Sequence, residues 1–542
     1  MRICLVFEGS YPYVHGGVSS WAHDYITALS EHEFVLWTVG ASSADRGSFV
    51  YDLPANVVQV HEVFLDDALH LGGFKREVRF TAREMEALRA LVHRGDPSWE
   101  VLVDLFQRKG VHPLAFLQSR AFMDLFCELC REEYPYVPFA DAFHATRSML
   151  LPVLYLLSGE VPRADAYHAV STGYGGLLAC LGSIVSGRPM LLTEHGIYTR
   201  EREEEIIRAD WVAPAFKGSW IRFFSMLSEQ AYARSFRVTS LFSAARALQV
   251  EMGCEADRCL VVPNGIRFER FCSIEPKPDD GWVDIAAVVR LAPIKDVKTL
   301  IYAFFELEQR VERVRLHILG GVDDEDYADE CHALVEQLGV RNAVFAGRVD
   351  VARYLEGVDF TVLSSISEGQ PLSVLESLAA ARPCVTTEVG CCRELLEGGP
   401  GDEFGTAGFV VPPMYRKGLA DALERMCESR RRRLEMGRIG RARIEAFYRH
   451  EDMVEGYRAL YRETERVFGA GDAQGAQGGR ASDAPGAGER RRLRKPSHAR
   501  RGLFARRRAG ADGCAAGTDG GAGEGASRGA DDAWEGGPSW QA

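Results

Sequence analysis

The fold class of this chain follows from the stretch Ser367-Glu368-Gly369-Gln370-Pro371-Leu372-Ser373-Val374-Leu375-Glu376. The apolar run before it, residues 358–363, predicts a buried parallel strand, and the apolar residues 377–381 after it predict a helix. The stretch is therefore predicted to be a loop that turns at Gly369 and Pro371 and enters a helix near Leu372. Ligands bind at such loops in open α/β sheets, and the free N–H groups at a helix start suit a phosphate.

Two carboxylates flank this predicted anion site. Glu368 lies before the helix start and Glu376 lies after it. Carboxylates accept hydrogen bonds from vicinal hydroxyls, so the pair suits a sugar on one side and a ribose on the other. In the alternative interpretation, Glu368 caps the helix and Glu376 is a solvated helix residue. These ten residues alone leave both interpretations open.

Strand and helix patterns alternate through both halves of the chain. In the first half, strands are predicted at residues 2–7, 33–39, 57–63, 166–170, 189–193, 238–242 and 260–262. In the second half, they are predicted at residues 284–290, 315–319, 343–345, 360–363 and 384–386. This alternation predicts an α/β fold with two doubly wound, Rossmann-like domains.

The domain boundaries are predicted from changes in composition. The first domain is expected to span residues 1–275, with a helical insertion at about 75–134. A polar segment rich in Pro, Asp and Gly opens the second domain, which is expected to span residues 276–443. Residues 444–468 are predicted to form one long helix that crosses back to the first domain.

The low-complexity segment 469–542 is predicted to be a disordered tail, because it has too few large apolar residues to bury a core. Its basic residues gather between Arg490 and Arg508. A solvated arm is the favoured interpretation. A basic arm that touches anionic lipid is the alternative, and it would place the protein at the periphery of a membrane.

Composition limits the classes of partner and compartment. The 542 residues carry a formal net charge of −13, which argues against nucleic acid as the main partner. The 13 cysteines lack a disulfide or zinc spacing and suit reduced thiols. The N-terminus lacks a signal-peptide pattern, and no apolar stretch has the length of a membrane span. A cytoplasmic protein is therefore expected.

Positive charge follows the first predicted strand of the second domain. Arg290 offers a guanidinium fork to phosphate oxygens, and Lys295 adds a point charge five positions later. Gly16-Gly17 follows the first strand of the first domain, where backbone N–H groups can approach a phosphate without interference from a Cβ. Both features predict an anion site, the first more strongly than the second.

The opening stretch resembles the E-x7-E motif of family 4 glycosyltransferases, which have the GT-B fold. Three further pieces stand in the order of that family, namely Gly16-Gly17, Pro263-Asn264-Gly265-Ile266 and the Arg290/Lys295 pattern. Residues 9–21, 168–174 and 192–202 are similar to the PelF subfamily, the cytosolic glycosyltransferases of Pel exopolysaccharide synthesis. The resemblance covers roughly residues 1–468.

The resemblance implies a GT-B architecture of two facing domains and a retaining, metal-independent hexosyltransferase. The implied donor is UDP-glucose or a related UDP-hexose, and the implied acceptor is a growing exopolysaccharide or another glycan. Membrane proteins of a polysaccharide-export complex are the suggested partners. Two alternatives stay open. One is a catalytically silent nucleotide-binding scaffold. The other is a hydrolase or phosphorylase, of which a hydrolase would need an acid/base carboxylate pair across the cleaved bond.

The family's functional positions map onto this sequence as follows. The implied catalytic residues are His195, Arg290, Lys295 and Glu368. The implied donor-binding residues are Gly16, Gly17, Arg348, Gly369, Leu372, Ser373 and Glu376, and the weaker acceptor assignments are Glu194 and Arg202. For His195 the alternative is a core histidine satisfied by the backbone. The acidic run at residues 323–326 is interpreted as a helix start and not as a metal site.

Overall fold

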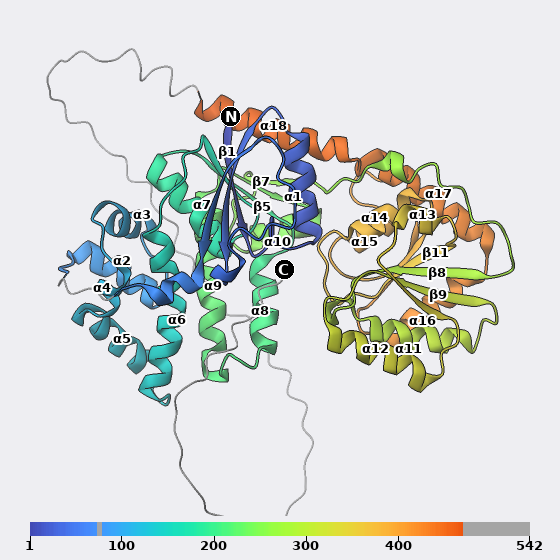
Figure 1. The fold of residues 1–542 in the computed structure, drawn as a ribbon, viewed down its shortest axis with the longest axis horizontal. Coiled ribbons are helices and arrows are strands. Elements are labelled where there is room, and N and C mark those ends of the chain that lie inside the picture. Colours follow the sequence, from blue (N-terminus) through green and yellow to red (C-terminus); the bar gives the residue numbers. More distant parts are fainter. Residues whose placement is uncertain (73–77, 470–542) are drawn as a thin grey trace, which may run out of the picture. The chain divides into compact units, whose positions relative to one another are not determined.

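The computed structural model describes residues 1–72 and 78–469. The predicted tail therefore lies outside the described residues except for Gly469, and residues 73–77 of the predicted insertion also lie outside them. The described residues contain two parallel β-sheets, each covered by helices (Figure 1). The alternation of strands and helices that the sequence predicts is thus present in both halves.

The first sheet has seven strands in the order β3-β2-β1-β4-β5-β6-β7. Its strands are β1 (Arg2–Glu8), β2 (Glu33–Gly40), β3 (Val57–Phe64), β4 (Ala166–Ala169), β5 (Met190–Glu194), β6 (Arg237–Ser240) and β7 (Cys259–Val261). The helices beside it are α1 (Gly17–Ala28), α7 (Gly173–Ser186), α8 (Tyr198–Arg208), α9 (Pro214–Arg234) and α10 (Ser243–Glu251). The chain reverses its direction of travel across the sheet at β1, so the loops after β1 and β4 lie at a switch point, where α/β sheets bind ligands.

The helical insertion lies between β3 and β4. It contains α2 (Ala82–Val92), α3 (Trp99–Val103), a π-helical turn (Asp104–Arg108), α4 (Pro113–Leu117), α5 (Arg120–Glu133) and α6 (Phe139–Leu157). Helices α4 and α5 are separate, because Ser119 caps α5 and its hydroxyl accepts a hydrogen bond from the N–H of Phe122 at 3.1 Å. Two short 3₁₀ turns, Ser43–Asp45 and Leu65–His70, flank β3.

The second sheet has six strands in the order β10-β9-β8-β11-β12-β13. Its strands are β8 (Val283–Val288), β9 (Val314–Leu319), β10 (Ala343–Gly347), β11 (Phe360–Leu363), β12 (Cys384–Thr387) and β13 (Gly408–Val411). Its helices are α11 (Val297–Glu308), α12 (Glu325–Leu338), α13 (Val351–Leu355), α14 (Leu372–Ala379), α15 (Cys392–Glu397) and α16 (Arg416–Cys427). Strand β13 was not predicted from the sequence; it is a four-residue edge strand whose first residue is a glycine.

The prediction of one helix over residues 444–468 is wrong. Helix α17 (Arg430–Phe447) ends there, and α18 (His450–Phe468) begins after a short break. The backbone N–H of Ile266 donates to the carbonyl of Tyr448 at 3.0 Å, and the N–H of His450 donates to the carbonyl of Ile266 at 2.9 Å. The segment that leaves the first sheet thus pairs with the chain between the two helices, and these bonds replace the helical ones.

Helix α18 packs its apolar side on the first sheet. The buried residues Met453, Val454, Tyr457, Leu460 and Tyr461 share one core with Ile3, Leu5 and Phe7 of β1. The hydroxyl of Tyr461 also lies 2.7 Å from Nδ1 of His168 in β4. The last helix therefore belongs to the core of the first domain. Within residues 1–72 and 78–469, no helix is both long enough and apolar enough to cross a membrane.

Candidate functional site

The loop between β11 and α14 is the stretch on which the sequence analysis centres. Helix α14 begins at Leu372, as predicted, and Pro371 precedes it without a capping side chain. The carbonyl of Pro371 accepts the first helical bonds, from the N–H groups of Val374 at 3.1 Å and Leu375 at 3.4 Å. The N–H groups of Leu372 and Ser373 precede these bonds, so they are the donors that a helix start offers to an anion.

Lys295 and Glu368 form an ion pair beside this loop. The Nζ of Lys295 lies 2.6 Å from Oε1 of Glu368, and the Ser365 hydroxyl donates to the same oxygen at 2.6 Å. Both side chains are mostly shielded, with 18% and 13% of their surface exposed. The backbone joins the two loops as well, because the N–H of Ile366 donates to the carbonyl of Ile294 at 2.9 Å. The loops after the adjacent strands β8 and β11 thereby bring together Lys295, the predicted phosphate-binding side chain, and Glu368, the predicted sugar-binding side chain.

Arg290 lies at the end of β8 and pairs with Asp323 in the loop after β9. The N–H of Leu291 donates to the carbonyl of Gly321 at 2.9 Å, which fixes the β8 loop against the β9 loop. Arg348, directly after β10, contacts the β9 loop, because a Cβ at Gly321 would be 2.7 Å from its Nε. Arg290 and Arg348 thus follow β8 and β10, the two strands that flank β9, and both contact the β9 loop.

The acidic run at residues 323–326 has two roles in this loop, and only its role as a helix start was predicted from the sequence. Asp324 caps α12 and accepts a hydrogen bond from the N–H of Tyr327 at 2.9 Å, which agrees with the predicted helix start. Asp323 instead pairs with Arg290, and no local pattern signals that contact. Among the described residues, no group of three His, Cys, Asp or Glu side chains is arranged to hold a metal ion.

Glu376 is half-buried in the second turn of α14, and it is not the solvated helix residue of the alternative interpretation. Burial raises the pKa of its carboxyl to about 7, with a smaller opposing effect from Arg270. Arg270 itself pairs with Asp350 at 3.0 Å, in the loop after β10. Arg270 and Asp350 could not be selected from the sequence, because they lie in separate segments and neither belongs to a recognisable motif.

His195 follows β5 and faces the aromatic side of α1. Its ring centroid lies 4.4 Å from that of Trp21, in an edge-on arrangement. Burial lowers the pKa of the imidazole to about 4, so the ring is neutral at pH 7. Within the described part of the chain its Nε2 has no hydrogen-bond partner, which is unlike a core histidine satisfied by the backbone.

The backbone of His195 also contacts the loop between β11 and α14, which contains the predicted donor-binding residues and is called the donor loop below. A Cβ at Gly369 would overlap the carbonyl oxygen of His195, so only glycine fits at this position without a shift. A second contact lies close by, where the Oε1 of Gln370 accepts a hydrogen bond from the N–H of Asn264 at 2.7 Å. Both Gln370 and Asn264 are buried. Two predicted residues of different domains, His195 and Gly369, therefore meet, and Gln370 is an additional contact that the sequence analysis missed.

Glu194 is a core residue, 2% exposed. Its Oε2 accepts hydrogen bonds from the Tyr232 hydroxyl at 2.7 Å and from the Gln249 side chain at 2.9 Å. Burial raises the pKa of its carboxyl to about 7. These internal partners hold the end of β5 in place. The acceptor role of Glu194 stays a prediction.

Arg202 lies near a carboxylate that the sequence analysis did not select. Glu8, at the end of β1, accepts hydrogen bonds from the Tyr198 hydroxyl at 2.8 Å and from the N–H of Gly175 at 2.9 Å. Burial raises the pKa of Glu8, and the positive charge of Arg202 opposes that shift. The guanidinium of Arg202 lies 5.2 Å from the ring centroid of Tyr198. The end of β1 and the first turns of α8 thus share one polar cluster, Glu8, Tyr198 and Arg202.

Gly16 and Gly17 form the start of α1. No side chain caps this helix start, and apart from chain neighbours and the helix's own backbone no described atom lies within 4 Å of a Cβ built at either glycine. The approach of a phosphate to this helix start stays a prediction.

Two sequence families match separate parts of the chain. Residues 1–257 match a family described as "Domain of unknown function (DUF3492)". Residues 283–429 match the family described as "Glycosyl transferases group 1", and this range contains Arg290, Lys295, Glu368 and Glu376.

Solved structures decide the fold. The chain is similar to HepE from Anabaena in complex with UDP and glucose, with a TM-score of 0.52 and 14% identity over 85% of this chain and 100% of that one. The chain has the GT-B fold. Sucrose-phosphate synthase from Thermosynechococcus elongatus shares this GT-B arrangement, with a TM-score of 0.53 and 15% identity over 86% of this chain and 99% of that one.

Characterised proteins match over shorter stretches of this GT-B chain. An MMP alpha-(1->4)-mannosyltransferase from Mycolicibacterium hassiacum is 26% identical over 267 residues, which are 48% of this chain and 62% of that protein. The amylovoran biosynthesis glycosyltransferase AmsK from Erwinia amylovora is 24% identical over 319 residues, which are 55% of this chain and 70% of that protein. The match to an alpha-monoglucosyldiacylglycerol synthase from Streptococcus pneumoniae spans 31% of that protein. The mannosyltransferase and the synthase are thus each matched over less than two thirds of their length.

Proposed function

We propose that this protein is a glycosyltransferase that moves a hexose from a nucleotide-sugar donor to a glycan during polysaccharide synthesis. The observation that carries the proposal is the Lys295–Glu368 ion pair beside the open N-terminus of α14. Cations, helix N–H groups and a carboxylate meet there at the carboxyl ends of adjacent parallel strands. A diphosphate joined to a sugar matches this set of charges and hydrogen-bonding groups.

The proposed chemistry follows from where negative charge develops. When the glycosidic bond breaks, the diphosphate gains charge, and fixed cations stabilise that state more than the ground state. Lys295 is already held in place by Glu368, whereas Arg290 must exchange Asp323 for the phosphate. The N–H groups of Leu372 and Ser373 would bind the same diphosphate.

The two carboxylates of the opening stretch have separate proposed roles. Glu376 binds the ribose hydroxyls, and Glu368 binds the donor sugar near its 3-OH group. Arg348 approaches the base, and His195, a neutral imidazole beside Gly369, lies near the sugar. On the first domain, Gly16-Gly17 approaches the donor phosphate, and the cluster of Glu8, Tyr198 and Arg202 is the proposed acceptor side.

The finer identity of the reaction is also proposed. UDP-glucose or a related UDP-hexose is the donor, transfer retains the anomeric configuration, and no metal takes part because Arg290 and Lys295 supply the positive charge. A PelF-like role in exopolysaccharide synthesis, on the cytoplasmic side and beside membrane proteins of an export complex, is supported by residues 9–21, 168–174 and 192–202. HepE, a structure of the same fold, was solved with UDP-glucose.

A ligand screen followed by donor turnover tests the proposal. The full chain is heated with UDP, ADP, GDP and their glucose conjugates, since a ligand that binds the native state raises the Tm. Uridine nucleotides are expected to give the largest shift. NMR then measures the release of UDP from UDP-glucose. The same spectra identify the anomer of the first sugar product, and the α-anomer is expected.

Three results would overturn parts of the proposal. A uridine nucleotide that raises the Tm without any donor turnover, with or without glycan, would favour the silent scaffold. Sugar release from a polysaccharide without nucleotide would favour a hydrolase. A β-anomer as the first product would contradict retention.

A further inference from the structure

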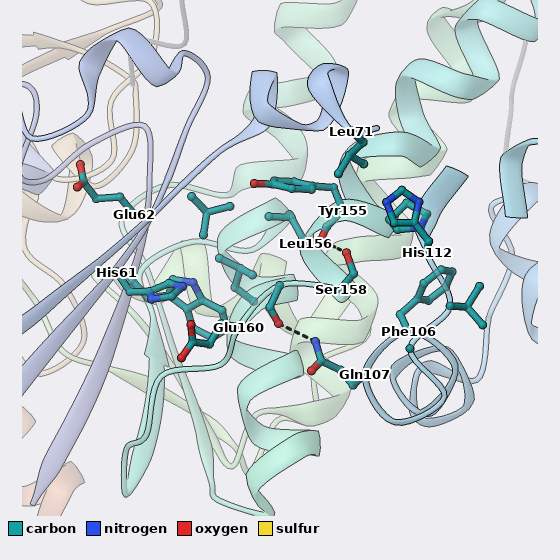
Figure 2. Close-up of a pocket in the computed structure, with 17 residues that line it drawn as sticks. His61, Glu62, Leu71, Phe106, Gln107, His112, Tyr155, Leu156, Ser158 and Glu160 are labelled. Carbon is teal, nitrogen blue, oxygen red and sulfur yellow. Dashed lines mark hydrogen bonds between the residues drawn. The ribbon is translucent and has the colours of Figure 1, made fainter. Parts of the chain in front are cut away.

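A cavity lies in the first domain, between the β2–β3 edge of the sheet and the helical insertion (Figure 2). Its volume is about 610 Å³, within the range of roughly 300–1,000 Å³ of small-molecule sites. Its 17 lining residues all lie between Trp37 and Leu178, so none belongs to the donor loop or to the second domain. Its chemistry can therefore be considered separately from the proposed donor site.

Three polar side chains of this cavity have unused hydrogen-bonding capacity. His61 of β3, Tyr155 of α6 and Glu160 after α6 line it together, and in Figure 2 His61 and Glu160 lie side by side. Within residues 1–72 and 78–469, none of the three side chains makes a hydrogen bond. Burial raises the pKa of Tyr155 and lowers that of His61, so both rings are uncharged at pH 7. Together they offer donors and acceptors to a ligand.

The wall that carries these groups is held by the protein itself. The Gln107 side chain, in the π-helical turn, donates to the carbonyls of Leu157 and Gly159, at 2.7 Å each. The Ser158 hydroxyl donates to the carbonyl of Tyr155 at 2.8 Å. The segment before Glu160 is therefore fixed without a ligand, which lowers the entropic cost of binding.

The charge of the lining excludes anions as ligands. None of the 17 lining residues is Lys or Arg, and two, Glu62 and Glu160, are carboxylates. Phosphates, nucleotides and acidic sugars would be repelled. Glu62 uses one oxygen, Oε1, for the Tyr13 hydroxyl at 2.7 Å and the N–H of Gly47 at 2.8 Å, which leaves its second oxygen for another donor.

Apolar side chains complete the lining. Val63, Leu71, Phe106 and Leu156 lie around the polar groups. A ligand that fits must present hydroxyl groups to carboxylates, an imidazole and a phenol, and an apolar C–H face to this surface. A pyranose ring has both features.

We propose that this cavity is a saccharide-binding site, separate from the donor site, that takes hexose units without negative charge. His61, Tyr155 and Glu160 bind the hydroxyl groups, and the apolar lining contacts the C–H face of the ring. The site lies within the match to the domain of unknown function.

Binding to the full chain tests the site directly. The probes are methyl α-glucoside, methyl α-galactoside, glucosamine and glucuronate, observed by saturation-transfer NMR without nucleotide. At least one of the first three is expected to bind with a millimolar Kd, and glucuronate is not. Glu160→Gln and Tyr155→Phe, which keep the shape of the cavity, are expected to weaken binding at least fivefold. Glu403→Gln, an exposed carboxylate of the second domain, is the matched control and is expected to change nothing.

The donor site provides the second control. Sugar binding to the cavity is expected to persist in Lys295→Ala, and the UDP-induced Tm shift is expected to persist in Glu160→Gln. Failure of donor turnover therefore leaves this test intact. The proposal is overturned if none of the first three probes binds, if glucuronate binds best, if Glu403→Gln weakens binding as much as the cavity variants, or if saturating UDP-glucose displaces the probe.

Discussion

The Nζ of Lys295 lies 2.6 Å from Oε1 of Glu368, although the two residues are 73 positions apart in the chain. One belongs to the loop after β8 and the other to the loop after β11. The proposed phosphate cation and the proposed sugar carboxylate are therefore one coupled unit. A donor that binds there engages both at once, and loss of either residue leaves its partner with less compensation.

Replacement of the proposed cations is expected to impair turnover. Lys295→Ala and Arg290→Ala should each lower kcat with a UDP-hexose by ~10²–10³, because each removes charge stabilisation from the leaving group. Steady-state UDP release measures the effect, and Lys417→Ala, an exposed lysine of α16, is the control. Unchanged turnover in both variants, with normal melting curves, would remove Lys295 and Arg290 from the mechanism.

The two carboxylates are expected to separate nucleotide binding from turnover. Glu376→Ala should weaken UDP binding, because Glu376 is the proposed ribose ligand. Glu368→Ala should leave UDP binding largely intact and reduce turnover of the sugar donor. Calorimetric titration of UDP into each variant, together with the rate, gives both quantities. Equal losses of UDP affinity would contradict the division of roles.

Gly369→Ala tests the contact between the donor loop and His195. The added methyl group would overlap the His195 carbonyl, so the two segments must move apart. We expect UDP affinity to change less than threefold, while kcat/KM for the sugar donor falls by about 10², as expected for a misplaced reacting group. Gly218→Ala in α9, where a Cβ meets nothing within 4 Å, is the matched control. A fully active Gly369→Ala enzyme would show that this close approach is not required.

The buried carboxyl of Glu194 predicts a pH dependence of stability. Its pKa is raised from 4.5 to about 7 in the folded protein, so between these values the native state holds a proton that the unfolded state has lost. Stability should therefore fall as pH rises through that window, by up to ~3 kcal/mol. In Glu194→Gln this contribution is absent.

Urea unfolding at pH 5 and pH 8 measures the difference. The wild type should lose stability relative to Glu194→Gln between the two pH values, whereas Glu403→Gln should follow the wild type. Parallel curves for the wild type and Glu194→Gln would mean that Glu194 titrates normally in the fold.

Chelation tests the proposed independence from metal. Donor turnover is expected to survive dialysis against EDTA, because two cationic side chains are assigned to the diphosphate. The measurement is the rate of donor turnover before dialysis, after dialysis, and after Mn²⁺ or Mg²⁺ is added. Loss of activity with EDTA and its recovery with Mn²⁺ would show that a metal ion shares the leaving-group charge.

The sequence by itself determined the local plan of this protein. Apolar runs and the turn residues that bound them predict strands, helices and the loop that enters α14 at Leu372, because these patterns depend on neighbours in the chain. The motif residues Arg290, Lys295, Glu368 and Glu376 could be selected for the same reason. Even some local elements could not be predicted from the sequence. The short strand β13 and the break between α17 and α18 escaped prediction, and the break depends on distant Ile266.

Only the tertiary structure decided which side chains meet and which are shielded from water. The contacts of Lys295 with Glu368 and of Arg290 with Asp323 arise because parallel strands bring the ends of distant segments to one edge. Gly369 meets His195 because loops of the two different sheets pack against each other. Only the packed structure shows that Glu194 is buried and that the Tyr198 hydroxyl donates to Glu8. A residue's environment depends on the whole packed chain, so neither its partners nor its pKa can be deduced from the residues next to it.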